Sequence, residues 1–316
     1  MTLTETPRYS LPENTFHQSW YTSTIFPDGA ITHTPLESAP NPFSISSIDP
    51  YDRIHYKIHT STSRTPTTMF IGGLHADELE GPTILMEEIL PRTTIPHIAI
   101  PCANPYAAWF ETRGWNMQKP DGQLNVIDLN RQFPLAPDGH HPNSQLTMPD
   151  AILLSNILCT FPQVGLLLSI HEDHEFGSNY STRPGGIYVY DHAPSAPKDL
   201  EFPRIQHQMN ILERHLHNHA FPLFTGYDDP HDPALQNYVD NGYVYQPVKK
   251  EDGTYCDNKT FEVFAAHLAN QGVLPPDFRA LVIEIPGQLS RERKREAVQL
   301  LFDHFIFPLI QQKGLL

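Results

Sequence analysis

The chain has 316 residues, and its 21 basic and 36 acidic side chains give a formal net charge of −15 with histidine neutral. Such an acidic protein is a poor partner for nucleic acid or for an anionic membrane surface. The length is sufficient for a full hydrophobic core, and a hydrophobic content of 39% lies far above that of disordered chains. Composition therefore predicts a folded protein and excludes the basic nucleic-acid-binding classes.

The cysteines and the first residues give an expectation about the cellular compartment. Cys102, Cys159 and Cys256 lie far apart, and no C-x-x-C pair occurs. An odd number without a pattern is typical of a reducing compartment. The first ten residues lack the basic and apolar regions of a signal peptide, and no apolar run approaches the ~20 residues of a membrane helix. We expect a cytoplasmic protein with neither nucleic acid nor a membrane as a partner.

The predicted elements alternate between strands and helices. Residues 1–50 are rich in Pro, Ser and Thr and predict an irregular N-terminal arm. Strands are expected at 54–60, 68–73, 98–101, 164–170, 187–190 and 280–286. Helices are expected at 78–90, 150–161, 203–219, 261–270 and 291–312, and 221–258 resembles a loop. Several strands are apolar throughout, which indicates an α/β fold with a mostly parallel or mixed central sheet and helices on both faces. Since no linker or repeat is visible, 51–316 is expected to be one domain.

Polar side chains come directly after two strands of the expected sheet. His75 and Glu78 follow the strand over 68–73, and His171 follows the strand over 164–170. In open α/β sheets, the loops after the carboxyl ends of strands form the ligand site. Two imidazoles and one carboxylate leave an open tetrahedral position on Zn²⁺, which is the arrangement of catalytic zinc sites. These three residues are our candidate metal ligands.

Two further stretches carry polar side chains with chemical potential. Asn130 and Arg131 offer an amide and a planar guanidinium group that suit a carboxylate ligand. Glu284 is the only acid in the apolar strand over 280–286. A buried carboxylate is costly there unless it has a partner or a catalytic role.

Each of these motifs alone has a more ordinary interpretation. An H-x-x-E pair is a weak metal signal, a single arginine is commonly part of a surface ion pair, and a buried glutamate can be satisfied by backbone amides or by an arginine. Their conjunction, in this chain order and at strand ends, favours an active site.

Together the motifs resemble the zinc carboxypeptidase family, the carboxypeptidase A-like metallopeptidases, and more distantly the succinylglutamate desuccinylase/aspartoacylase deacylases. The resemblance runs from about residue 54 to the end of the chain. H-A-D-E at 75–78 matches the family's zinc motif, S-I-H at 169–171 its third-ligand strand, and T-R at 112–113 with D-L-N-R at 128–131 its substrate-carboxylate region. The resemblance implies a carboxypeptidase A-like catalytic domain with one zinc ion per chain.

The family's metal and base residues carry over by position. The resemblance implies that His75, Glu78 and His171 bind zinc. It also implies that Glu284 is the general base, which takes a proton from the attacking water and returns it to the leaving amine.

The substrate side carries over in the same way. Arg113 would polarise the scissile carbonyl and stabilise the oxyanion. Asn130 and Arg131 would hold the terminal carboxylate of the substrate, and Asp128 would orient His75. The family's substrate-capping tyrosine cannot be assigned, because five tyrosines compete: Tyr227, Tyr238, Tyr243, Tyr245 and Tyr255.

Three functions are compatible with these residues. We favour a zinc metallocarboxypeptidase that cleaves an amide next to a free carboxylate, in a peptide or a small amino-acid conjugate such as a cell-wall fragment. The alternative is an N-acyl amino acid deacylase of the aspartoacylase type, which uses the same zinc and glutamate. Such deacylases carry an extra β-rich domain after the catalytic glutamate, whereas here 32 residues follow Glu284 and predict one helix. A second alternative is a catalytically silent zinc- or peptide-binding module.

Overall fold

The structure is a computed structural model of the chain. It describes residues 30–32, 57–60, 66–75, 77–78, 80–89, 92–93, 95–100, 102–104, 113–118, 124–134, 145–146, 148–173, 186–194, 201–221, 239–240, 242–249, 253, 256 and 258–312.

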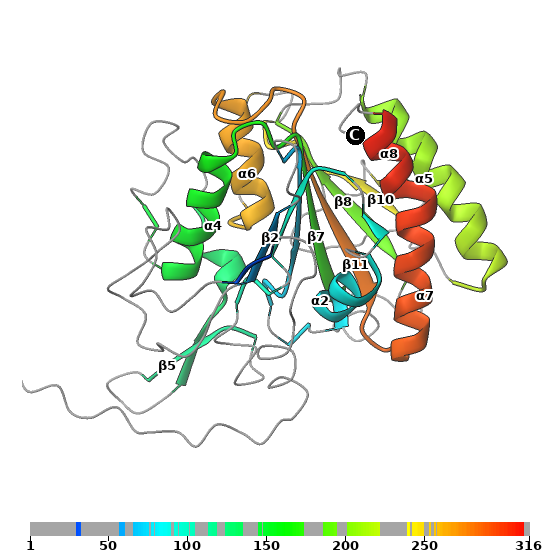
Figure 1. Cartoon of the computed structure of the whole chain (residues 1–316), viewed down its shortest axis with the longest axis horizontal. Helices are drawn as coiled ribbons and strands as arrows, with labels where there is room; N and C mark the ends of the chain where they lie inside the picture. Colours follow the sequence, from blue (N-terminus) through cyan, green and yellow to red (C-terminus); the bar gives the residue numbers. More distant parts are fainter. Residues whose placement is uncertain are drawn as a thin grey trace, which may run out of the picture.

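A mixed sheet forms the centre of the molecule (Figure 1). Within the described residues it has nine strands, in the order β1-β2-β4-β3-β7-β11-β8-β10-β9. Four neighbouring strands are parallel to one another and form its middle: β3 (Thr68–Gly72), β4 (His97–Ile100), β7 (Leu166–Asp173) and β11 (Arg279–Pro286). The flanking strands are β1 (Ala30–Thr32), β2 (Lys57–Thr60), β8 (Tyr188–His192), β9 (Val239–Asp240) and β10 (Tyr243–Tyr245).

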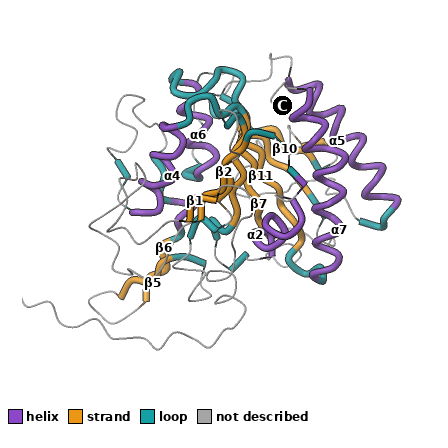
Figure 2. The backbone as a smooth tube through the Cα atoms, in the orientation of Figure 1, coloured by secondary structure: helices purple, strands orange, loops and turns teal. Residues whose placement is uncertain are grey.

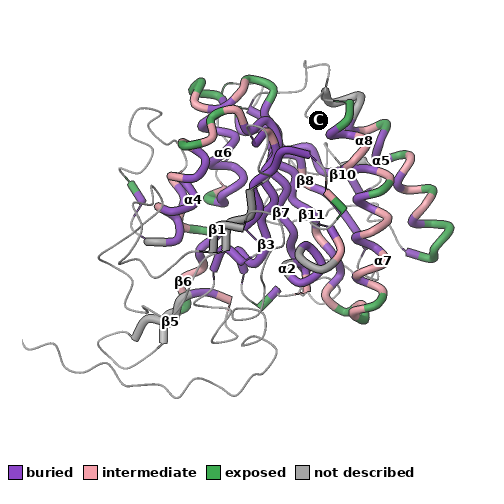
Figure 3. The backbone as a smooth tube through the Cα atoms, in the orientation of Figure 1, coloured by how far each residue is buried: buried purple, intermediate pink, exposed green. Residues whose placement is uncertain are grey.

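Helices cover both faces of the sheet (Figure 2). The helices α4 (Pro149–Thr160) and α6 (Phe261–Asn270) share one apolar cluster with Met69 and Leu167. The opposite cluster contains Phe70 and Leu168. The helical segments that contribute to that cluster are α2 (Glu80–Ile84) with the π-helical turn Leu85–Ile89, α5 (Glu201–Asn218), α7 (Arg291–Leu301), the π-helical turn Phe302–Ile306 and α8 (Phe307–Gln312). The side chains of successive strand residues thus point into the two apolar clusters in turn. The middle strands are therefore buried on both faces (Figure 3). The predicted fold class is confirmed.

Side-chain caps explain where two of the helices begin. The hydroxyl oxygen of Thr260 accepts a hydrogen bond from the backbone N–H of Val263 at 3.3 Å, which starts α6. Ser290 accepts from Arg293 N–H at 3.4 Å and starts α7 in the same way. Such caps satisfy backbone donors that have no partner within the helix. No described helix is long and apolar enough to cross a membrane.

Some short elements differ from the sequence-based prediction. The chain forms a two-stranded hairpin of β5 (Trp115–Gln118) and β6 (Leu124–Ile127), and β9 and β10 lie within the stretch that resembled a loop. The K-P-D-G sequence between β5 and β6 is a turn signal that would have indicated the hairpin. Strand β1 lies within the N-terminal arm and pairs with β2. The rest of that arm is outside the described residues, so the division at residue 50 stays a prediction.

Candidate metal centre and active site

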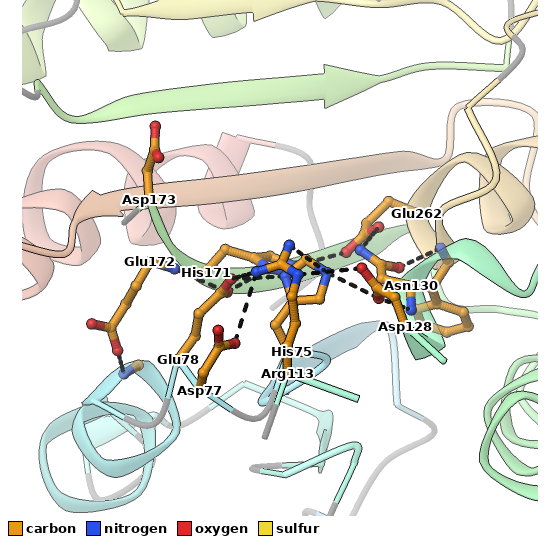
Figure 4. A network of polar contacts seen from close by, with 12 residues as sticks. His75, Asp77, Glu78, Arg113, Asp128, Asn130, His171, Glu172, Asp173 and Glu262 are labelled. Carbon is orange, nitrogen blue, oxygen red and sulfur yellow. Dashed lines mark hydrogen bonds and ion pairs between the residues drawn. The ribbon is translucent and has the colours of Figure 1, made fainter. Parts of the chain in front are cut away.

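The three candidate metal ligands meet at the carboxyl ends of β3 and β7 (Figure 4). One donor atom from each of His75, Glu78 and His171 lies within 4.8 Å of the others. His75 Nδ1 is 2.8 Å from one Glu78 oxygen, and His171 Nδ1 is 2.9 Å from the other. All three side chains are buried. This donor set fits a divalent ion, because tetrahedral ligands of Zn²⁺ lie about 3.3 Å apart for Zn–N bonds of ~2.0–2.1 Å.

Local geometry brings these side chains together. His75 and Glu78 are on the loop that follows β3, while His171 is near the carboxyl end of β7. Gly81 lets α2 approach this strand, because a Cβ there would lie 2.7 Å from Ile170 Cγ2. The backbone N–H of Glu172 also donates to Glu78 Oε2 at 3.1 Å. The loop and the strand are thus joined through one carboxylate.

The three candidate ligands perturb each other's pKa values. Burial lowers the pKa of His171, but the Glu78 carboxylate and its hydrogen bonds outweigh this effect, and the pKa lies well above its usual value. His75 shows the same balance of burial against Glu78 and Asp128, and its pKa is raised. Burial raises the pKa of Glu78, but the charges of the two histidines lower it to well below the ordinary value. Glu78 therefore favours a cation at this position, whether the protons of the histidines or a bound metal ion.

Asp128 and Arg113 lie directly behind and beside this triad. Asp128 Oδ1 is 3.2 Å from His75 Nε2, the ring nitrogen that faces away from Glu78. Arg113 contacts Glu78 Oε1 at 3.2 Å and Asp128 Oδ2 at 3.4 Å, and its side chain is 40% exposed. Gly114 permits this approach, because a Cβ there would lie 2.1 Å from the carbonyl oxygen of Ile127, just before Asp128. Both residues thus lie in contact with the candidate metal ligands, and the roles that the resemblance implies for them stay predictions.

The side chains of Asn130 and Arg131 point in different directions. The 3₁₀ turn Leu129–Arg131 is capped by Asp128, which accepts from Asn130 N–H at 2.8 Å. The Asn130 amide is buried, and its oxygen accepts from Phe261 N–H at 2.8 Å. Arg131 is exposed, and its Nη1 donates to the carbonyl of Asn130. The Asn130 side chain thus contacts α6, whereas Arg131 faces outward, and contact of either with a substrate carboxylate stays a prediction.

Glu284 lies beside His171 in the sheet. The two residues are register partners on the parallel strands β11 and β7, so their side chains point to the same face. Burial raises the pKa of Glu284 to about 8; the Glu78 and Asp173 carboxylates raise it further, and His171 opposes them. A group that exchanges a proton near neutral pH, next to a metal-ligand set, is suited to general acid–base chemistry.

The acidic run after His171 has structural contacts in its described part. Glu172 Oε1 accepts from the backbone N–H groups of Glu80 and Gly81 at the start of α2, and its other oxygen pairs with Lys294 of α7. Asp173 accepts from the hydroxyl of Tyr188 at 2.8 Å. These contacts fix the end of β7 between two helices.

Of the five tyrosines that compete as the substrate cap, the structure describes two. These are Tyr243 and Tyr245 of β10, and both side chains are buried. Tyr227, Tyr238 and Tyr255 lie outside the described residues, so no capping tyrosine is assigned.

Glu262 is a site residue that sequence reasoning missed. It is 1% exposed on α6, and its Oε1 lies 3.3 Å from His171 Nε2. Burial raises the pKa of Glu262, but the hydrogen bond and charge of His171 lower it to about 2. An acid in the otherwise apolar stretch F-E-V-F-A-A could have been noticed by the argument used for Glu284. Acids are common in the first turn of helices, however, and this made Glu262 inconspicuous.

Comparisons with solved structures show what the whole fold resembles. A structure from Shewanella denitrificans, described as a "putative metallopeptidase", is 19% identical, with a TM-score of 0.52 over 88% of this chain and 83% of that chain. Structures with the same description from Shewanella amazonensis and Shewanella baltica give TM-scores of 0.54 and 0.53, at 19% and 15% identity. They cover 81% and 89% of this chain and 82% and 86% of theirs. These likenesses establish the fold. No family model and no curated protein matches the sequence.

Proposed function

We propose that this protein is a zinc-dependent hydrolase that cleaves an amide bond next to a free carboxylate, in the manner of a metallocarboxypeptidase. One observation carries the proposal: His75, Glu78 and His171 converge at the strand ends, and Glu284 is the register partner of His171. Two imidazoles and a carboxylate are the ligands of catalytic zinc. The likeness to structures described as metallopeptidases supports the same class of reaction.

The residues around the triad then have distinct proposed roles. A bound Zn²⁺ would supply Lewis-acid chemistry, lowering the pKa of water and polarising the carbonyl. Glu284 takes the proton of the attacking water and delivers it to the leaving amine. Arg113, beside Glu78 and partly exposed, donates to the carbonyl oxygen as negative charge develops. Asp128 accepts from His75 Nε2–H and keeps Nδ1 directed toward Glu78.

Arg131 is the proposed anchor for the substrate carboxylate. It is exposed at the end of the 3₁₀ turn that Asp128 caps, where a bidentate pair with a carboxylate can form. The substrate is a peptide or a small amino-acid conjugate, such as a cell-wall fragment, with a free carboxylate near the scissile amide. The proposed location is the cytoplasm.

A substrate panel tests the proposal. Zinc-loaded protein is incubated with peptides that carry a free C-terminal carboxylate, with the same peptides amidated, and with N-acyl amino acids, and the released amines are quantified by chromatography. We expect release from the free peptides, loss of activity on chelation and recovery on adding Zn²⁺. Release from N-acyl amino acids alone would establish the deacylase alternative instead. No turnover of any class by zinc-loaded protein would indicate the silent binding module.

A further inference from the structure

A buried glutamate lies behind the second histidine ligand. Glu262 is the second residue of α6, and every described side chain from Phe261 to Ala269 is buried. An ionised carboxylate in such a place is costly unless specific groups satisfy it. The groups around it include His171, with Nε2 at 3.3 Å from Glu262 Oε1, and Asn130, with Nδ2 at 3.4 Å from Glu262 Oε2. The side chain of Ser169 and the backbone N–H of Glu262 also lower the pKa of this carboxyl group.

We infer that Glu262 is a positioning residue of the metal centre, which holds His171 in the orientation and tautomer that metal binding requires. The inference rests on the metal site of the proposed function. His171 directs Nδ1 toward Glu78 at 2.9 Å and Nε2 toward Glu262. With the proton on Nε2 donated to Glu262, the lone pair of Nδ1 is free for the ion. A carboxylate behind a histidine ligand fixes its tautomer and increases its basicity.

A similar arrangement occurs at the first histidine, where Arg113 Nη2 also lies 3.2 Å from His75 Nε2. His75 directs Nδ1 toward Glu78 at 2.8 Å and Nε2 toward Asp128 at 3.2 Å. Each imidazole therefore has the shared ligand Glu78 on one side and a carboxylate of its own on the other. Asp128 comes from the loop after β6, and Glu262 comes from α6, so two separate elements hold the two rings (Figure 4).

Asn130 connects the two supporting carboxylates. Its backbone N–H donates to Asp128 at 2.8 Å, and its side-chain amide donates to Glu262. The amide oxygen accepts from Phe261 N–H at 2.8 Å, which fixes the first turn of α6. The turn that carries Asp128 and the helix that carries Glu262 are thus joined by one buried amide. Movement of α6 would therefore disturb the His171 ring.

Metal affinity, measured apart from turnover, tests the inference. Zinc affinity is determined by competition with a chromophoric chelator for the full-length wild type, Glu262→Gln and Glu262→Leu. The absorption spectrum of the Co²⁺-loaded proteins reports the ligand geometry. We expect Glu262→Leu to bind Zn²⁺ about 10- to 100-fold more weakly and to change the Co²⁺ spectrum. Glu262→Gln keeps an acceptor oxygen but no charge, so its loss should be smaller than that of Glu262→Leu.

Asp191→Asn is the matched control. Asp191 is as buried as Glu262, and it contacts Arg279 at 3.2 Å and the hydroxyl of Tyr243. The control should lower thermal stability while zinc affinity and the Co²⁺ spectrum stay at wild-type values. This control shows whether a loss of zinc affinity follows from removing any buried carboxylate or only from removing Glu262.

Three results would overturn the proposed role of Glu262. Wild-type affinity and spectrum in folded Glu262→Leu would overturn the inference, as would an equal loss of affinity in Asp191→Asn. If Glu262→Leu does not fold, Glu262→Gln decides, and an unchanged affinity and spectrum in that variant overturn the inference. A wild-type protein that binds no zinc would instead contradict the proposed function, so the two failures are distinguishable.

Discussion

Replacing Glu284 with glutamine tests the proposed chemistry at one atom. Glutamine keeps the shape of the side chain beside His171 but cannot accept a proton at neutral pH. If Glu284 is the general base, Glu284→Gln should retain zinc while kcat falls by about 10²- to 10⁴-fold, the usual contribution of a positioned base. Glu296 of α7 is partly buried and pairs with Arg293 and His219, and the control variant Glu296→Gln should keep full activity.

The pKa of Glu284 gives the size and sign of a second effect of the same variant. In the metal-free protein the pKa of Glu284 is raised from 4.5 to about 8, so this carboxyl group is ionised in about 10% of the molecules at pH 7. A raised carboxyl pKa means that wild-type stability decreases as pH rises from 4.5 through 8, because the desolvated carboxyl group is harder to ionise in the folded chain than in the unfolded chain. The shift corresponds to at most about 3 kcal/mol at pH 7, and the partly exposed side chain makes this an upper limit. Glu284→Gln removes the effect and should stabilise the metal-free protein at pH 8 but not at pH 4.5.

The assays are steady-state kinetics of the zinc-loaded proteins and urea unfolding of the chelated proteins at several pH values. The wild-type kcat/KM should rise with pH as Glu284 ionises, and the bound cation should move this rise below pH 8. Near-normal turnover in Glu284→Gln would refute the general-base role. Loss of zinc would make Glu284 a ligand, and a pH-independent stability difference from the wild type would refute the ionisation argument.

Four further predictions concern the rest of the site. Purified protein should contain about one zinc ion per chain and His171→Ala should lose it, as elemental analysis would show; stoichiometric zinc in the variant would exclude His171 as a ligand. Because the pKa values of His75 and His171 are raised, protons compete with the metal, so zinc affinity from chelator competition should fall as pH decreases from 8 to 5.5, and a flat profile would contradict this. Arg131→Met should lower kcat/KM by about 10²-fold for a free carboxylate substrate but much less for its amide, and equal losses would refute the anchoring role. Asp173→Asn should lower the pKa of Glu284 and shift the acidic limb of kcat/KM to lower pH, whereas an unmoved limb would show that the two carboxylates do not interact in the loaded enzyme.

Several features follow from sequence alone because the information is local. Apolar runs mark β3, β7 and β11, and the polar residues that interrupt or follow them stand out against that background. His75, Glu78 and His171 could therefore be selected before any contact was known. Glu284 could be selected too, since an acid inside an apolar strand is unusual whatever its neighbours are.

Other features depend on which elements pack together. Glu262 is 91 residues from His171, and Asn130 is 131 residues from the Phe261 amide that it caps. On the sequence, Glu262 is an ordinary acid in the first turn of a helix, and Asn130 is an ordinary turn residue. Only the packing of α6 against the sheet places one carboxylate behind the His171 ring and directs the Asn130 amide inward rather than toward solvent. Sequence periodicity encodes which face of an element is apolar, but it does not encode which distant polar groups that burial brings within hydrogen-bonding distance.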